Sequence, residues 1–146
     1  MVLSIEDRLA IQDLYARFNH AADTGDVETY VNSYTDDAVF ISPVRRAHGK
    51  EEIRAFIAAR SDALATAPVR DEQHWNNNLV VDGDGDSAIG SIYMVGIGRD
   101  AQTGELRFNY FGRYHDTLAK ESDGRWRFRK RHFNEHMNPL PPDADE

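Results

Sequence analysis

The sequence predicts a single α+β domain in which N-terminal helices are wrapped by a strongly curved, mostly antiparallel sheet. Apolar residues recur at helical spacing through most of the first half of the chain. Residues 73–134 instead hold four stretches rich in β-branched and aromatic residues, separated by turns. At 146 residues, the chain fits one domain over 1–134, followed by a Pro- and Asp-rich tail over 135–146.

Three helices are expected in the first half. Ser4 has the character of an N-cap with an acidic third position after it, and apolar residues then follow at helical spacing, which predicts a helix over about 5–23. Gly25 ends this helix, and Asp26 caps a short second one. The third helix follows Gly49. Its stripe holds Ile53, Phe56, Ile57, Arg60 and Leu64.

Five strands are expected. Ala38–Ile41 forms a strand between the second and third helices, and Ser42-Pro43 ends it. The remaining strands follow one another with short turns, the clearest of which is the Asp-Gly run 82–86, so they favour an antiparallel meander. These strands are predicted at 73–82, 86–98, 106–118 and 125–134.

Composition narrows the functions that this chain can have. It carries 17 Lys and Arg against 25 Asp and Glu, a net charge of −8 that would repel a phosphate backbone, so no nucleic-acid partner is expected. It has no cysteine, which excludes thiolate chemistry. It shows neither a signal-peptide pattern nor the roughly 20 consecutive apolar residues of a membrane span. We therefore expect a cytoplasmic protein that does not bind membranes.

Two segments superficially match metal-binding motifs. The alternating aspartates that begin at Asp82 resemble the start of a calcium loop, but its sixth and twelfth positions are Ser87 and Tyr93. The segment 132–136, His-Phe-Asn-Glu-His, fits a zinc pattern that requires a helix, whereas here it follows a strand-like run. No metal and no cofactor is predicted.

Asp23 is the first candidate functional residue. It lies in the last turn of the first helix, where the helix dipole disfavours a carboxylate, and on the flank of the apolar stripe. A carboxylate in this position can be retained because it serves a partner group. The alternative is that it belongs only to the polar turn 23–26.

The later strands supply the other candidates. In the strand that contains His74, alternation places Asn76 and Asn78 on the histidine's face, which is too polar for a plain core. This face either lines a cavity or lies on the outer surface of the sheet. Arg131 ends the last strand within a basic run, which is either a functional cation or part of a solvated face. The tyrosines at 30, 34 and 110 are either core residues or hydrogen-bond donors to a substrate.

In combination, these residues resemble the SnoaL-like branch of the nuclear-transport-factor-2-like superfamily. Within it, the chain is most similar to scytalone dehydratase and lindane dehydrochlorinase. The resemblance covers about residues 4–134. It rests on Ile11–Tyr15 leading to Asp23, Tyr34–Ala38, His74 with Asn78 four residues later, Gly112–Tyr114, and Gly124–Trp126 leading to Arg131.

The resemblance implies a cone-shaped barrel with a deep, largely apolar pocket. It also implies a catalytic dyad of Asp23 and His74, with Arg131 as the cation of the last strand. A basic residue in the first helix of the dehydrochlorinase falls at Phe18 here, which speaks against dehydrohalogenation. Family members also include cyclases, isomerases, hydrolases and non-enzymatic binding modules.

We therefore predict a cofactor-independent lyase, of dehydratase type or eliminating another small fragment, that acts on a hydrophobic, aromatic or polyketide-like small molecule. His74 would act as general base and Asp23 would orient it. The residues left to bind substrate are Phe18, Tyr30, Tyr34, Asn76, Asn78 and Tyr110. An isomerase or aldol-type cyclase with the same base, and a binding module, are the alternatives. A homo-oligomer, either a trimer or a dimer, is expected from the family.

Overall fold

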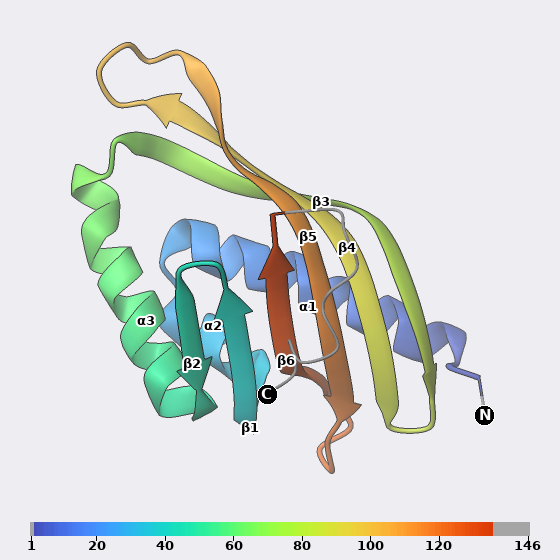
Figure 1. The fold of residues 1–146 in the computed structure, drawn as a ribbon. Helices are drawn as coiled ribbons and strands as arrows, with labels where there is room; N and C mark the ends of the chain where they lie inside the picture. Colours follow the sequence, from blue (N-terminus) through green and yellow to red (C-terminus); the bar gives the residue numbers. More distant parts are fainter. Residues whose placement is uncertain (1, 136–146) are drawn as a thin grey trace.

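We describe residues 2–135 in a computed structural model. The helices precede most of the sheet and lie on one of its faces (Figure 1). The helical elements are α1 (Ile5–Thr24), α2 (Val27–Asn32), α3 (Gly49–Ala63) and the 3₁₀ turn η1 (Leu64–Thr66). The strands are β1 (Tyr34–Ser42), β2 (Arg45–His48), β3 (Val69–Asp84), β4 (Ser87–Asp100), β5 (Leu106–Lys120) and β6 (Trp126–Asn134).

The caps of α1 are those that the sequence predicts. The Ser4 side chain accepts a hydrogen bond from the Asp7 backbone N–H, and Gly25 ends the helix in the left-handed conformation at φ 76°. Asp7 also accepts hydrogen bonds from Lys120 Nζ at 2.9 Å and Trp126 Nε1 at 2.8 Å. The start of the chain is thereby fastened to the end of the sheet.

The six strands form one sheet in the order β2-β1-β6-β5-β4-β3. All neighbours are antiparallel except β1 and β6, which run parallel. The sheet curls around the helices and stays open, because β2 and β3 are its two edges and do not pair. The α+β class is confirmed, and the expected barrel is a curled, unclosed sheet.

Strand β2 was not predicted. Its sequence Arg-Arg-Ala-His carries little β propensity, and it follows Pro43 and Val44 in the turn from β1. Pairing with β1, in which Phe40 lies opposite Ala47, holds it in the extended conformation. A tertiary contact, and not local preference, makes this strand.

Several register shifts interrupt the strand pairs, and two of them, near Asn78 in β3 and at Arg129 in β6, change how predicted site residues face the helices. In β3, Asn78 adopts φ 56° and the register with β4 shifts between Asn77 and Val80. His74 and Asn76 therefore share the inner face with Leu79 and Val81, while Trp75 and Asn78 are exposed on the outer side. The prediction that Asn78 shares a strand face with His74 is wrong, because the bulge reverses the alternation of side chains after Asn77.

The bulge in β6 has the same effect. The register between β5 and β6 shifts where Thr117 pairs with Lys130 and Leu118 with Phe128, so that Arg129 is an extra residue. Phe128 and Arg131 consequently both point inward, three positions apart. Arg131 is buried in the core and does not extend a solvated basic face.

Candidate active site

Asp23 and His74 meet where the end of α1 packs against β3. The Asp23 carboxylate lies 2.5 Å from His74 Nδ1 and also accepts the His74 backbone N–H at 3.1 Å. Asn19, one turn earlier on α1, donates to the His74 carbonyl at 3.1 Å. An ionised carboxylate only accepts hydrogen bonds, so this contact places a proton on Nδ1 and turns Nε2 away from Asp23. The imidazole is thus fixed in orientation.

The imidazole is placed beside Tyr110 by a row of residues across three strands. His74 pairs with Gly96, and Gly96 pairs with Tyr110. A Cβ on Gly96 would collide with the Tyr110 ring, so the glycine leaves room for that ring. The His74 and Tyr110 rings stack with centroids 5.9 Å apart and an interplanar angle of 16°. Burial raises the pKa of the Tyr110 hydroxyl above its usual value.

A second charged pair lies next to the dyad. Arg60 donates to Glu72 at 2.7 Å and to the Ala22 carbonyl at 2.7 Å, and Asn109 donates to the other Glu72 oxygen. Glu72 lies 3.9 Å from His74 Nε2, beyond hydrogen-bond distance. This pair was not among the predicted site residues. The sequence does contain a clue to this pair, because Arg60 is the one charged residue on the apolar stripe of the third helix.

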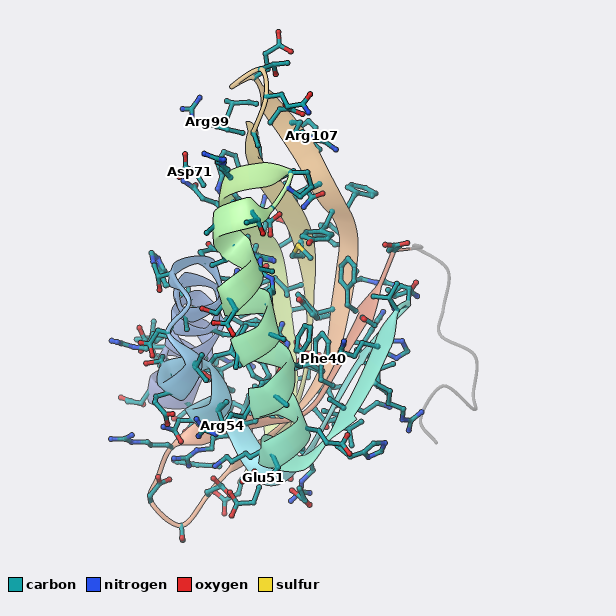
Figure 2. All side chains as sticks on the ribbon, turned by 90° about the vertical axis from the view of Figure 1, so that its left-hand side faces the viewer. Phe40, Glu51, Arg54, Asp71, Arg99 and Arg107 are labelled. Atoms are coloured by element: carbon teal, nitrogen blue, oxygen red, sulfur yellow. The ribbon has the colours of Figure 1, made fainter. Side chains whose placement is uncertain are left out.

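Beside His74 lies a cavity of about 330 Å³ between the helices and the inner face of the sheet. Figure 2 shows Phe40 pointing into the space between α3 and the strands. The walls are mainly apolar and aromatic, as in many small-molecule sites. The lining residues are Phe18, Ala22, Tyr30, Phe40, Ser42, Pro43, Val44, Arg45, Phe56, Ile57, Arg60, His74, Met94, Tyr110, Tyr114, Phe133 and Glu135.

The structure brings some of the predicted site residues to this cavity and separates others from it. Phe18, Tyr30, His74 and Tyr110 line it, and Asp23 supports His74 from behind. Burial raises the pKa of the Tyr30 hydroxyl well above its usual range, so this hydroxyl remains a donor. Besides Asp23, the predicted residues that do not line the cavity are Tyr34, Asn76, Asn78 and Arg131.

These four residues have different environments. Tyr34 and Arg131 are buried in the core behind the cavity, and Asn78 is exposed on the outer side of β3. Asn76 faces inward, and its amide nitrogen and oxygen are buried without a hydrogen-bond partner among residues 2–135.

Arg131 is held by a buried carboxylate. Its Nε and a terminal nitrogen donate to the two Asp116 oxygens at 3.0 and 3.1 Å, and Tyr15 donates to Asp116 at 2.6 Å. The guanidinium also lies 3.8 Å from the Tyr114 ring centroid and 4.0 Å from that of Phe128. Although burial alone would lower it, the pKa of Arg131 is raised by Asp116, so the guanidinium stays charged.

The structure also bears on metals and membranes. Within residues 2–135, no group of three or more His, Cys, Asp or Glu side chains is placed to hold a metal ion. In the zinc-like segment, His132 is part of β6, and His136 lies outside the described residues, as does the tail from 136 onward. No helix in the described part of the chain is long and apolar enough to cross a membrane.

Comparison with solved structures finds the same architecture in proteins of similar length. A protein of unknown function from Nostoc punctiforme superposes with a TM-score of 0.80 at 27% identity, over 94% of this chain and 97% of that one. A protein from Novosphingobium aromaticivorans, provisionally named an aromatic ring hydroxylase, gives a TM-score of 0.74 at 30% identity over 98% and 97% of the two chains.

A protein from the same bacterium, provisionally named a scytalone dehydratase, shares the fold. Its TM-score is 0.74 at 18% identity, over 96% of this chain and 95% of that one. A family model described as a SnoaL-like domain matches residues 3–132. Because this match covers most of the chain, and its architecture is that of nuclear-transport-factor-2-like proteins, the protein belongs to the SnoaL-like family.

Proposed function

We propose that this protein is a cofactor-independent lyase that eliminates water, or another small fragment, from a hydrophobic aromatic or polyketide-like molecule. The observation that carries the proposal is the 2.5 Å contact between Asp23 and His74 Nδ1 at the wall of an apolar cavity. An imidazole that is oriented in this way, with a free Nε2, is a general base ready to accept a proton.

In this elimination, His74 takes one proton and later returns it, so the reaction needs no other acid or base. Nε2 of His74 takes a proton from a carbon next to a carbonyl group, and the C–H electron pair becomes a C=C bond as the C–O bond breaks. Asp23 stabilises the imidazolium that forms. The leaving hydroxide then takes the proton back from His74 and departs as water, so the dyad returns to its starting state.

The negative charge that develops on the substrate carbonyl oxygen needs hydrogen-bond donors. Proton transfer by a positioned base contributes about 10²–10⁴-fold to a rate, so electrostatic stabilisation must supply the remainder. Tyr30 and Tyr110 line the cavity and keep their protons, which makes them the donors in this proposal. Arg131, held in the core by Asp116, positions the aromatic rings behind the cavity.

The cavity favours a flat, largely apolar substrate of modest size. Phe18, Phe40 and Phe56 contribute aromatic wall, and a cavity of about 330 Å³ is at the small end of ligand sites, which usually measure about 300–1,000 Å³. A bicyclic β-hydroxy ketone such as 3-hydroxy-1-tetralone fits these requirements. Its loss of water gives 1-naphthol, which is fluorescent.

Turnover of 3-hydroxy-1-tetralone, followed by mass spectrometry and naphthol fluorescence, tests the proposal. We expect His74→Ala and Asp23→Asn each to lower kcat by at least about a hundredfold, with unchanged folding by circular dichroism. His20→Ala is the matched control, because His20 is an exposed histidine on the same helix as Asp23. Unchanged turnover in both dyad variants would refute the dyad mechanism.

The mass of the product separates this proposal from the alternative reactions in which His74 would also act as base. An isomerase or aldol-type cyclase leaves the mass of its substrate unchanged, whereas a dehydratase product is lighter by one water. Binding of the tetralone without conversion by the wild-type protein would favour a binding module.

A further inference from the structure

The cavity is lined by two arginines with different surroundings. Arg60, from α3, is fully engaged with Glu72 and the Ala22 carbonyl. Arg45, from the first position of β2, makes no ion pair with any carboxylate among residues 2–135. An arginine at an apolar cavity without a carboxylate partner can form two parallel hydrogen bonds with a ligand.

Aromatic rings hold the Arg45 side chain at the cavity. Its guanidinium carbon lies 4.9 Å from the centroid of the Phe56 ring, which in turn stacks on Phe40 at 5.4 Å and 19°. This arginine–phenylalanine–phenylalanine stack joins β2, α3 and β1. Stacking leaves the edge of the guanidinium, where its N–H groups are, open to a planar acceptor.

Strand geometry explains why Arg45, and not its neighbour, faces the cavity. Side chains alternate along β2, and buried Ala47 marks the inner side, so Arg45 shares that side. Arg46 lies on the opposite side, where its Nε contacts His48 Nε2 at 3.1 Å. Arg46 is therefore a natural control for an experiment that substitutes Arg45.

We propose that Arg45 binds the carboxylate of an aromatic acid whose ring system lies in the cavity. This proposal rests on the cavity being the substrate site of the proposed function and goes beyond it by assigning the substrate a negative charge. One unpaired guanidinium suits a single planar carboxylate better than a phosphate dianion, whose binding sites collect several cations or a helix N-terminus.

One residue of the cavity wall carries a negative charge that would repel an anionic ligand. Glu135, directly after β6, also lines the cavity and makes no ion pair with Arg45. Its charge reduces the attraction for a carboxylate and would favour a ligand amine instead. Ligands that share one ring system but carry an acidic, a neutral or a basic group therefore show whether Arg45 or Glu135 dominates binding.

Calorimetric titration with 2-naphthoate, 2-naphthamide and 2-naphthylmethylamine makes this comparison. We expect the wild-type protein to bind the carboxylate about tenfold more tightly than the amide, an effect between that of an exposed and a desolvated ion pair. Arg45→Gln should abolish this preference, whereas Arg46→Gln should retain it. Glu135→Gln should increase it.

Equal affinity for the acid and the amide, tighter binding of the amine, or an unchanged preference in Arg45→Gln would each overturn the proposal. The same titration with His74→Ala separates it from the proposed function. If that variant retains both the carboxylate preference and full turnover, the dyad mechanism fails while carboxylate recognition stands. If the preference is missing but the dyad variants lose turnover, only carboxylate recognition fails.

Discussion

Asp23 and Asp116 each hold one basic side chain, but only Asp23 does so at the cavity. Asp23 contacts an imidazole that lines the cavity, whereas Asp116 pairs with a guanidinium enclosed by aromatic rings. Burial raises the pKa of the Asp116 carboxyl, and the hydrogen bonds from Arg131 and Tyr15 counteract this effect. The two carboxylates therefore have different environments: Asp23 orients an imidazole at the cavity, and Asp116 neutralises a cation in the core.

Asp116→Asn tests the structural role of the buried pair. The substitution leaves the Arg131 charge in the core without its counterion, so we expect the free energy of unfolding to fall by about 3–5 kcal/mol. Urea denaturation measures this change. Asp13→Asn breaks an exposed pair with Arg17 and should leave the transition almost unchanged. A wild-type midpoint for Asp116→Asn would show that the pair does not stabilise the core.

At the level of elements, the extra residue near Asn78 in β3 and the one at Arg129 in β6 determine which of the nearby side chains reach the interior. Each bulge shifts the alternation by one position, and this brings Arg131 inward and turns Asn78 outward. Strict alternation would instead have aligned Asn78 with His74 and placed Arg131 in a solvated basic row. The outcome depends on pairing between strands that are distant in sequence, and local patterning does not encode it.

The bulge in β3 can be tested at Asn78, whose φ of 56° is in the left-handed region. Glycine adopts this conformation without strain, so Asn78→Gly should retain wild-type stability. Asn78→Val should lower the free energy of unfolding by about 1–2 kcal/mol, because a β-branched residue is strained there. Thermal unfolding of the two variants provides the comparison. Equal stability of the glycine and valine variants would mean that the bulge imposes no strain.

At the scale of the whole molecule, the helices cover one face of the sheet, and no helix among residues 2–135 covers the other (Figure 1). Trp75, Val95 and Phe111 lie side by side on the uncovered face across β3, β4 and β5. Trp75 is 56% exposed and Phe111 is 66% exposed. Large apolar side chains that remain exposed in a group are typical of an interaction surface.

We propose that this face mediates the homo-oligomer that the family resemblance implies. Sedimentation equilibrium should then give a mass above the 16.6 kDa of one chain. The double variant Trp75→Glu/Phe111→Glu should sediment as a monomer, because two carboxylates would be desolvated at the interface. Leu9→Glu, which replaces an exposed leucine on α1, is the control and should not dissociate it. A monomeric wild-type protein would contradict this proposal.

Local sequence patterns predicted most of the fold and half of the site. Periodicity and capping residues located the three helices and five of the six strands, because these signals depend on near neighbours. An unfavourable position at the end of a helix marked Asp23, and a strand face too polar for a plain core marked His74, although their pairing followed from the family resemblance. Strand β2 escaped prediction because only its pairing with β1 makes it extended.

The remainder of the site depends on contacts between distant segments. Residues 60 and 72 come together only because the chain folds the end of α3 close to the start of β3, and Arg45 reaches the cavity only because β2 pairs at the edge of the sheet. The chain thus specifies its α+β class, its helices and its chemically unusual residues through local preferences. Which of those residues share a cavity was decided by strand register and bulges, since one inserted residue moves a side chain to the opposite face of a sheet.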